Sequence, residues 1–420
     1  MLFVMIVRKY TFKLYPSRQE VQRMLDTKRI HCDLRNAALQ ERIEAYRKRG
    51  ISITFAQQCK SLTEIRAFDP EIASVNAASQ QVTLNRLKKS FDAFFRRVKK
   101  GEAPGFPRFK SFARFPGWGY KQHGDGFRFH SDGEKHGRLY LSGIGTIKAR
   151  GKMRIQGKIK CCEILHRNDQ WYVSLTVEAE SADRVCLGSG AFGFDWGVDT
   201  LLTGVTSSGE IIERENPRWY KTAEARQTSL QQAVSRKKLR SKGWKRACKA
   251  LRTFKSKQAR KRHDHHHKLS AEIAENHAAV CGEALQVKNM TRSAKGTVEE
   301  PGKRVAQKSG LNREILDTAP GALYAMINYK VSETGSWFVK APTKSLKPSQ
   351  RCPVCWEPKR KTLNERVHLC ENCGHTGPRD QVSAHVNLIW LEQQLQAGNQ
   401  PDRACPVRNR DLISPEIRSW

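Results

Sequence analysis

The sequence has no long apolar run and is short of acidic residues. No stretch among its 420 residues approaches the roughly 18 apolar positions that a membrane-spanning helix needs. The opening Met1–Val7 is too short for a secretory signal and no basic segment precedes it, so we expect it to lead into a first strand. The apolar fraction of 38% is low, yet it suffices for two or three domain cores. We therefore expect a soluble multidomain protein without a membrane partner.

Acidic side chains number 41 against 76 lysines and arginines, which leaves a formal net charge of +35. A surplus of this size repels itself in the folded state unless a polyanion neutralises it. Nucleic acid carries one phosphate per nucleotide and is the usual partner of such chains, whereas membrane surfaces and acidic proteins are weaker candidates. The composition therefore indicates binding of nucleic acid.

Disulfides are not needed to explain the 12 cysteines, because four of them form two C-x-x-C pairs. The two pairs offer four thiolates to one tetrahedral Zn²⁺ ion and leave no open position, so the metal is expected to be structural. The ligands would be Cys352, Cys355, Cys370 and Cys373. Lys359 and Arg360 on the connecting loop are candidate nucleic-acid contacts. A metal pattern of this kind is typical of a reducing, intracellular compartment.

The first hundred residues are predicted to form a strand followed by helices. Polar and apolar residues alternate over Arg8–Pro16, as in a half-buried strand. Ser17 is a candidate N-cap for a helix that runs to about Arg49, and Gly50 is a candidate C-cap. We expect a second helical block from about Phe55 to Lys100.

Composition changes at Gly101. Residues 101–120 are rich in Gly, Pro, aromatic and basic side chains, which offer stacking faces beside phosphate-seeking charges. An equally good interpretation is a loop packed by its own aromatics. The candidate nucleic-acid contacts in this segment are Arg108, Lys110 and Arg114. Short alternating runs separated by glycine over Phe127–Val177 predict a small β-barrel or sandwich.

Three acidic residues have positions suited to a metal site. Asp195 lies within the strand-like run 191–198, where a buried carboxylate is costly without a cation. Glu283 ends another apolar run, and Asp380 begins a predicted helix. Two acids on strands and one at a helix start can hold two Mg²⁺ ions ~4 Å apart for phosphodiester hydrolysis. For Asp195 taken alone, a structural turn between glycines is the commoner explanation.

A long basic helical hairpin is predicted from Trp219 to about His277, with a break at 241–243. It ends in a histidine cluster in which His263 and His267 share one helix face, a spacing that could suggest a metal. Because no third ligand converges nearby, we favour a phosphate-contacting or solvated surface over a zinc site.

The order of these elements resembles the TnpB family, the RNA-guided nucleases of insertion sequences that are related to type V CRISPR effectors. The resemblance covers nearly the whole chain. Two positions depart from the family pattern. Trp356 stands where the first knuckle often has Gly. Asn387 lies one residue later than usual and is not carried over as a site residue. The segments that carry the resemblance are Tyr10–Pro16, Gly105–Lys110, Leu139–Lys148, Gly193–Gly197, His267–Ser270, Val280–Leu285, Leu311–Leu316, Ser349-Gln350, the paired cysteines and Arg379-Asp380.

The resemblance implies an α+β multidomain fold. The expected parts are an N-terminal wedge β-barrel (1–16 and 101–185), a helical recognition domain inserted in the barrel (17–100), a C-terminal RNase H-like (RuvC) α/β domain (186–342 and 376–396), an inserted zinc ribbon that binds target nucleic acid (343–375) and a disordered tail (397–420).

The resemblance further implies an RNA-guided DNA endonuclease that cuts next to a short adjacent motif. Asp195, Glu283 and Asp380 would be the catalytic ligands of two Mg²⁺ ions, and the four paired cysteines would hold structural Zn²⁺. A guide RNA folded from the transposon end would neutralise the charge, and base pairing with it would select double-stranded target DNA. The expected location is a prokaryotic cytoplasm, in association with the nucleoid.

Three other functions compete with this one. An RNA-guided DNA-binding protein that represses transcription without cutting would have a distorted metal site, which the shifted spacing after Asp380 permits. A DNA transposase of the same core fold usually places Glu last, whereas the order here is Asp, Glu, Asp. A basic structural protein of chromatin type would explain the charge, but not four spaced thiolates beside three placed acids.

Overall fold

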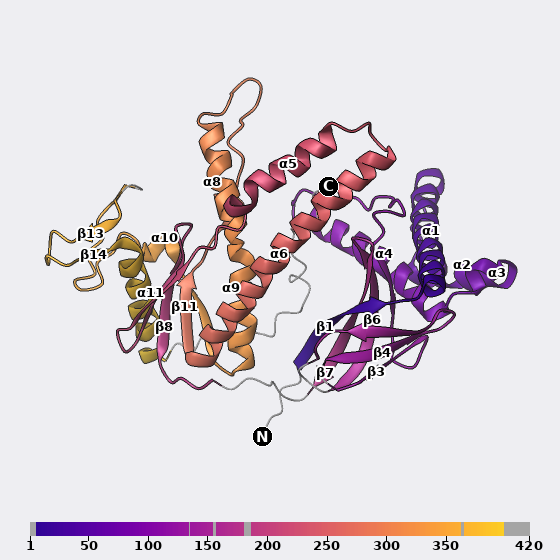
Figure 1. The fold of residues 1–420 in the computed structure, drawn as a ribbon, viewed down its shortest axis with the longest axis horizontal. Helices are drawn as coiled ribbons and strands as arrows, with labels where there is room; N and C mark the ends of the chain where they lie inside the picture. The colour runs from indigo at the N-terminus through magenta and orange to yellow at the C-terminus, as the bar shows by residue number, and fades with distance from the viewer. Residues whose placement is uncertain (1–5, 134, 154–156, 180–185, 363–364, 399–420) are drawn as a thin grey trace. The chain divides into compact units, whose positions relative to one another are not determined.

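The computed structural model describes residues 6–133, 135–153, 157–179, 186–362 and 365–398. The chain forms two compact units that divide between Ser181 and Ala182, and each unit is described by itself (Figure 1). The tail expected to be disordered, 397–420, lies outside the described residues from 399 onward, as do residues 1–5 at the start. Within the described ranges, every helix is too short or too polar to cross a membrane.

Unit 1 is built on a curled sheet of antiparallel strands. The order across this seven-stranded sheet is β2-β6-β7-β1-β5-β4-β3, so the first strand of the chain lies in its centre. Phe12 of β1 and Trp118 of β2 are fully buried in one core, and the alternation predicted for Arg8–Pro16 is confirmed. The strands are β1 (Ile6–Tyr15), β2 (Gly117–Tyr120), β3 (Phe127–Ser131), β4 (His136–Leu141), β5 (Gly145–Arg150), β6 (Lys158–Arg167) and β7 (Gln170–Ala179).

The helices of unit 1 lie between β1 and β2 in the chain. They are α1 (Arg18–Arg49), α2 (Phe55–Phe68), α3 (Pro70–Ala73) and α4 (Ala77–Lys99). Ser17 caps α1, and Gly50 ends it with a left-handed φ of 65°, as predicted. The helical block predicted from about Phe55 to Lys100 is confirmed, but it is divided into separate helices, first because Pro70 has no N–H with which to continue α2. Asp69 caps α3 and Asn76 caps α4, so the block is three helices.

Acid is expected to destabilise unit 1 through His31 of α1. Its fully buried ring has the hydroxyls of Thr83 and Ser79 at 2.9 and 3.3 Å from its two nitrogens, and burial lowers its pKa to about 3. The unfolded chain takes up this proton below about pH 6.5 and the folded chain does not, so stability falls by about 1.4 kcal/mol per pH unit between pH 6.5 and 3. Denaturant unfolding at several pH values measures the slope. His31→Gln is expected to flatten it, and an unchanged slope in that variant would contradict the assignment.

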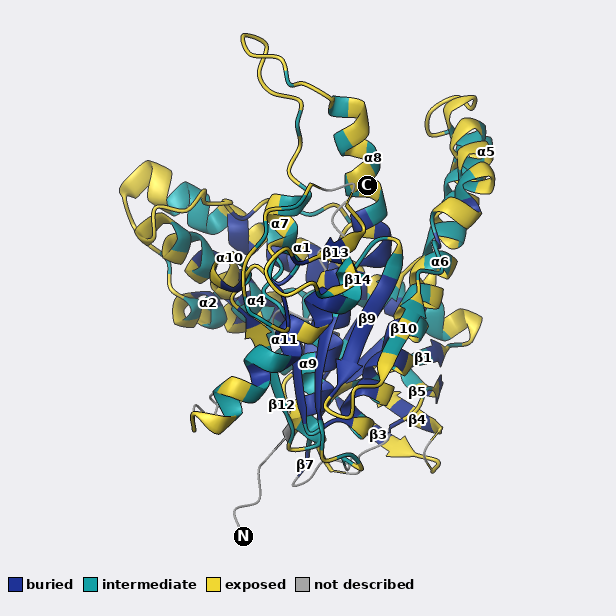
Figure 2. Ribbon diagram, turned by 90° about the vertical axis from the view of Figure 1, so that its left-hand side faces the viewer, coloured by how far each residue is buried: buried dark blue, intermediate teal, exposed yellow. Residues whose placement is uncertain are grey.

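Unit 2 contains a mixed sheet in which three neighbouring strands run parallel. The order across this five-stranded sheet is β10-β9-β8-β11-β12, in which the first three strands pair antiparallel and β8, β11 and β12 run parallel. Figure 2 shows β9 buried along most of its length, as expected for an inner strand. The strands are β8 (Ala191–Trp196), β9 (Thr200–Thr206), β10 (Ile211–Glu215), β11 (Ala279–Glu283) and β12 (Trp337–Ala341).

Helices cover both faces of this sheet. Phe192 and Phe194 of β8 pack with residues of α6, α8 and α9, whereas Ala191 packs with residues of α11 on the opposite face. The predicted hairpin over 219–277 corresponds to α5 and α6, and Ser241 in the predicted break caps α6. The helices are α5 (Glu224–Ser235), α6 (Lys242–Asn276), α7 (Val287–Met290), α8 (Val305–Thr318), α9 (Pro320–Glu333), α10 (Thr343–Leu346) and α11 (Arg379–Gln396), with a short 3₁₀ turn at Lys221–Ala223.

The prediction of a solvated histidine surface on α6 is wrong for His266. This residue is 1% exposed, its ring makes an edge contact with Trp219, and burial lowers its pKa to about 3. It shares a helix face with the buried Leu269 and Ile273, which turn it into the core. The preference against a zinc site at these histidines stays a prediction.

Candidate functional site

Asp195 and Glu283 lie at the carboxyl ends of two neighbouring parallel strands. The register of β8 and β11 pairs Phe194 with Gly282, so the two acids are the next residues along their strands. Side chains alternate between the faces of a sheet, and this alternation directs both acids to the face that α11 covers. Strand pairing thus brings together two carboxylates that are far apart in the sequence.

Asp380 approaches the same face from α11. The helix begins directly after β14 (Thr376–Pro378) and packs on β8, β9 and β11. Asp380 lies in its first turn, where the helix dipole favours a negative charge. The Arg379 Nε is 3.4 Å from the Asp380 carboxylate, and the same guanidinium donates to the carbonyl of Glu365 at 3.3 Å. Arg379 therefore holds a positive charge beside this acid.

The pKa of Asp195 reflects how closely the three acids are grouped. Burial, followed by the negative charges of Glu283 and Asp380, raises the pKa of Asp195 well above its usual range, while Arg379 acts in the opposite direction. Burial raises the pKa of Glu283 to about 7. Carboxylates that repel one another are stabilised by a bound cation, and Mg²⁺ prefers oxygen ligands, so these residues fit a divalent metal.

Two buried polar side chains beside the acids were missed by the sequence reasoning. Asn387, set aside because of its shifted spacing, is fully buried and donates to the carbonyl of Phe194 at 3.1 Å, which ties α11 to β8. The Tyr324 hydroxyl of α9 is buried without a hydrogen-bond partner, and burial with the charges of Asp195 and Glu283 raises its pKa. An amide on the apolar face of a helix requires a partner, which was the available signal for Asn387. Tyr324 carried no such signal.

Gly193→Ala is expected to separate α11 from β8. A Cβ at Gly193 would lie 2.4 Å from the backbone nitrogen of Leu388 and 2.5 Å from the carbonyl oxygen of Ala384, both in α11. Backbone atoms in a packed core cannot yield as a flexible side chain can, so the helix that carries Asp380 has to move. We expect a loss of about 1–3 kcal/mol in the free energy of unfolding, together with loss of cleavage.

The matched control for this change is Gly321→Ala on α9, where an added Cβ meets nothing within 4 Å. A helical Gly→Ala change at an open position is expected to be neutral or slightly stabilising. Thermal melting compares the stability of the two variants, and we expect the lower melting temperature for Gly193→Ala. Equal melting temperatures would show that the contact between β8 and α11 is not tight.

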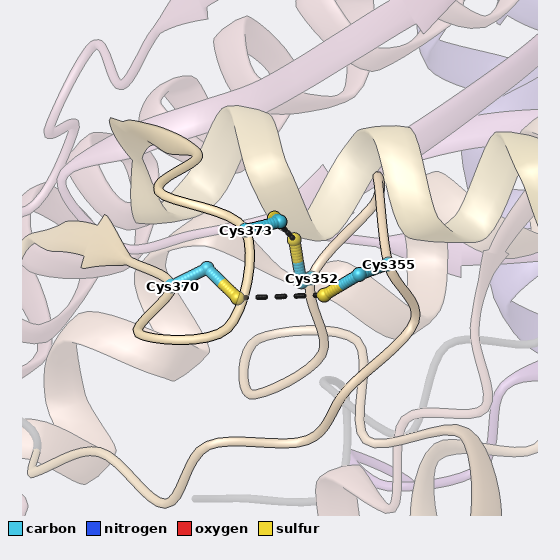
Figure 3. Close-up of side chains that lie close together, drawn as sticks. All are labelled: Cys352, Cys355, Cys370 and Cys373. Carbon is cyan, nitrogen blue, oxygen red and sulfur yellow. Dashed lines mark hydrogen bonds between the residues drawn. The ribbon is translucent and has the colours of Figure 1, made fainter.

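The four cysteines of the two C-x-x-C pairs converge (Figure 3). The sulfur atoms of Cys352 and Cys373 are 3.6 Å apart, those of Cys355 and Cys370 are 3.5 Å apart, and all four lie within 4.8 Å of one another. Four sulfurs bound at ~2.3 Å to a tetrahedral ion would be about 3.8 Å apart, so the cluster fits Zn²⁺. No other set of three or more such ligands groups in this way within the described residues.

The cysteines lie in a small ribbon whose short hairpin is formed by β13 (Val367–Leu369) and β14. Trp356, which departs from the family pattern, adopts the left-handed φ of 64° that Gly supplies without strain. The Arg351 guanidinium lies 5.4 Å from the centre of the Trp356 ring and donates to its carbonyl at 2.7 Å. The turn is therefore retained with Trp in place of Gly.

The predicted nucleic-acid contacts of unit 1 lie on the loop before β2. Arg108 and Arg114 are exposed and Lys110 is half-buried. The loop is fastened to α1 through its backbone, because Arg35 donates to the carbonyl of Arg108 at 3.0 Å and Asn36 donates to that of Lys110 at 2.8 Å. These contacts use main-chain atoms of the loop, and the role of its basic side chains stays a prediction.

The predicted contacts of the ribbon differ from each other in environment. Arg360 is exposed. Lys359 forms an ion pair with Glu371 at 2.6 Å and also donates to the carbonyl of Leu369, so it helps to hold the ribbon itself. Binding of nucleic acid by either residue stays a prediction.

Two segments of the chain match known families. Residues 174–294 match OrfB_IS605, described as "Probable transposase", and residues 321–387 match the "Cas12f1-like, TNB domain". The first segment contains Asp195 and Glu283, and the second contains Asp380 and the four cysteines. The matched segments therefore include every acid and thiol of the candidate site.

Similar proteins are known from bacteria. An Escherichia coli K12 protein named "Putative RNA-guided DNA endonuclease InsQ" is 28% identical over 329 residues, 78% of each chain. A Streptomyces pristinaespiralis protein named "Putative RNA-guided DNA endonuclease" is 25% identical over 424 residues, 98% of this chain and 96% of that one. The fold is similar to one in the "Cryo-EM structure of the Cas12f1-sgRNA-target DNA complex", with a TM-score of 0.53 and 15% identity, over 88% of this chain and 82% of that chain. These matches, together with the order of the motifs, support the resemblance of the chain to the TnpB family.

Proposed function

We propose that this chain is an RNA-guided DNA endonuclease that hydrolyses phosphodiester bonds with Mg²⁺. The observation that carries the proposal is the grouping of Asp195, Glu283 and Asp380 on one face of the mixed sheet, close enough for their charges to interact. The names of the relatives support an RNA guide and a DNA target. The net charge of +35 supports long polyanionic partners, which we take to be a guide RNA from the transposon end and double-stranded target DNA.

The domain assignment is part of this proposal. The sheet order of unit 2, with acids at the ends of adjacent parallel strands and α11 across them, supports an RNase H-like (RuvC) domain. The curled sheet of unit 1 supports a wedge barrel, and its four helices support a recognition domain. The proposed parts keep the bounds expected from the sequence: barrel 1–16 and 101–185, recognition helices 17–100, RuvC domain 186–342 and 376–396, and zinc ribbon 343–375.

In the proposed mechanism, the three carboxylates would hold paired Mg²⁺, which when bound supplies an activated water and stabilises the leaving oxygen. Strand pairing fixes Asp195 and Glu283, and the start of α11 fixes Asp380, so the ligands are held on rigid elements. Arg379 orients Asp380 and offsets part of the repulsion among the acids. The four cysteines would hold structural Zn²⁺ and so shape the ribbon that leads into α11.

The test is cleavage by the purified ribonucleoprotein. RNA that copurifies with the full chain is sequenced, and double-stranded DNA that matches its guide segment is prepared with a randomised flank to supply the adjacent motif. We expect cleavage of the matched DNA with Mg²⁺ and none without it. Binding of matched DNA without cleavage would favour an RNA-guided binding protein, and joining of strands would favour a transposase.

A further inference from the structure

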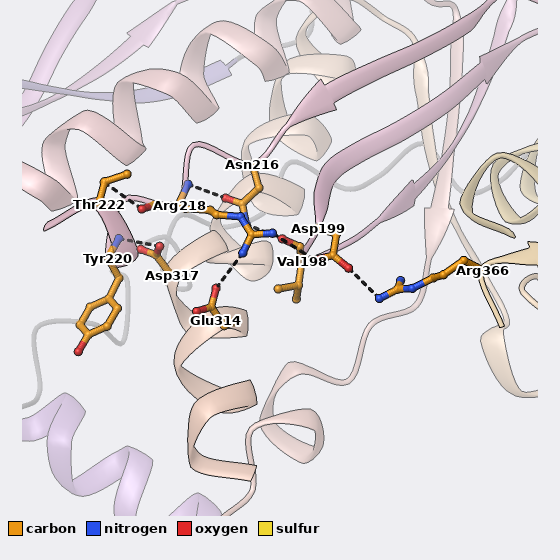
Figure 4. Close-up of polar contacts among 9 residues, drawn as sticks. All are labelled: Val198, Asp199, Asn216, Arg218, Tyr220, Thr222, Glu314, Asp317 and Arg366. Atoms are coloured by element: carbon orange, nitrogen blue, oxygen red, sulfur yellow. Dashed lines mark hydrogen bonds and ion pairs between the residues drawn. The ribbon is translucent and has the colours of Figure 1, made fainter. Parts of the chain in front are cut away.

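One exposed carboxylate links two arginines from distant parts of unit 2 (Figure 4). Asp199 lies in the turn between β8 and β9. Its Oδ1 accepts from the Arg218 guanidinium at 3.1 Å, and its Oδ2 accepts from the Arg366 guanidinium at 2.7 Å. Arg218 follows β10 and Arg366 precedes β13, so a single side chain connects the sheet, the segment that leads to α5, and the ribbon.

Asp199, Arg218 and Arg366 lie next to segments that carry the acids of the candidate site. Asp199 follows Asp195 by four residues, just beyond the end of β8. The carbonyl of Arg366 accepts from the N–H of Arg379 at 2.8 Å, and Arg379 precedes Asp380 in the chain. A ligand bound between the two arginines would therefore lie next to the segments that carry two of the three acids.

Arg218 is held by contacts other than the one to Asp199. Its backbone has a left-handed φ of 47°, and its N–H donates to Asn216 Oδ1 at 3.0 Å, while Asn216 donates to the carbonyl of Val198 at 2.6 Å. Its second terminal nitrogen, NH1, is 4.0 Å from the carboxylate of Glu314 on α8. These contacts fix the backbone of Arg218, and the pair with Glu314 remains when the Asp199 side chain turns away, so that the NH2 of Arg218 becomes available to another anion.

We propose that Arg218 and Arg366 form a binding site for a phosphodiester of the DNA strand that is cut, and that Asp199 occupies this site until the strand displaces it. Guanidinium groups bind phosphate oxygens through the same N–H donors with which they bind a carboxylate. We take the ligand to be a phosphate of DNA because the two arginines border the three acids of the candidate site. This step rests on the proposed function.

Displacement of Asp199 is feasible because the pairs are open to solvent. The side chains of Asp199 and Arg366 are 57% and 59% exposed, and that of Arg218 is 34% exposed. Ion pairs at this exposure contribute little to stability. A DNA strand brings several phosphates at once and releases its condensed counterions on binding, an advantage that a single tethered carboxylate does not have.

The test measures DNA binding without guide RNA or cleavage. The full-length, zinc-loaded chain, stripped of nucleic acid, is titrated with a fluorescent single-stranded oligonucleotide at several salt concentrations in the absence of Mg²⁺. Asp199→Asn removes the carboxylate that the strand must displace, so we expect this variant to bind the oligonucleotide several-fold more tightly than the wild type. Arg218→Gln combined with Arg366→Gln removes the two phosphate contacts and is expected to make the dependence of log K on log salt shallower by about 1.4.

The matched control is Asp132→Asn in unit 1, which removes the same charge from an exposed acid beside one arginine, Arg138. We expect it to leave the affinity unchanged. Equal affinities of the Asp199 and Asp132 variants, or a salt slope that loss of both arginines leaves unchanged, would overturn the proposal. Because neither guide nor cleavage enters this readout, its failure is distinguishable from failure of the proposed nuclease function.

Discussion

Asp195→Asn is expected to lower the rate of target cleavage by at least about a thousandfold, which corresponds to about 4 kcal/mol of activation free energy. Asparagine keeps the shape of the side chain but lacks the negative charge that holds a divalent ion. The same change is expected to raise the melting temperature, because the raised pKa of Asp195 means that its charge is unfavourable in the folded state at neutral pH. Lost activity in a more stable protein separates loss of a metal ligand from unfolding.

The measurement compares cleavage with RNA-guided DNA binding on the same preparations. Binding by the Asp195→Asn ribonucleoprotein is expected to stay within a few-fold of the wild type. Asp264→Asn serves as the control, since it neutralises an exposed acid that forms an ion pair with Lys268 along α6, at 2.9 Å. It is expected to leave cleavage unchanged. Cleavage by Asp195→Asn within tenfold of the wild type would remove Asp195 from the site.

Cys352→Ser is expected to unfold the ribbon and abolish cleavage. Cys352 is fully buried among the four thiols, and a structural zinc site contributes about 10–16 kcal/mol of binding free energy that the fold depends on. The ribbon leads directly into α11, and its Glu365 and Arg366 are hydrogen-bonded to Arg379, so its loss also releases the start of the helix that carries Asp380. We expect bound zinc to fall from about one ion per chain to nearly none.

Zinc content by elemental analysis and thermal melting check this prediction. Cys248→Ser is the control, because Cys248 is a half-buried cysteine on α6, remote from the ribbon in the sequence. It is expected to retain both zinc and cleavage. A Cys352→Ser chain that still holds one zinc ion would exclude this residue as a necessary ligand.

The two candidate metal sites could be predicted because their signals are local in the sequence. The C-x-x-C spacing by itself places two thiols on one turn, and the structure brings the two turns together as expected. Asp195 and Glu283 are acids within apolar runs of the sequence, where burial of a charge is costly unless a partner compensates it. The alternation of side chains along a strand then predicts the sheet face to which each acid points, but only the pairing of β8 with β11 makes the two acids neighbours.

The remaining features depend on tertiary contacts that leave no local pattern. Asp199, Arg218 and Arg366 are ordinary charged residues in the sequence, and the ion pairs of Asp199 span 19 and 167 positions. His266 was grouped with its basic neighbours, although its apolar partners on α6 turn it inward. Breaks between helices depend on single capping residues such as Asn76, which a search for apolar periodicity passes over.

Counting bound Mn²⁺ tests directly whether the three separated acids together hold divalent metal. Mn²⁺ accepts the same oxygen ligands as Mg²⁺ and is paramagnetic, so its binding to the zinc-loaded full chain can be followed by electron paramagnetic resonance. We expect two ions per chain, with binding weakened at least about tenfold by each of Asp195→Asn, Glu283→Gln and Asp380→Asn. Equal Mn²⁺ binding by the wild type and all three variants would contradict this expectation.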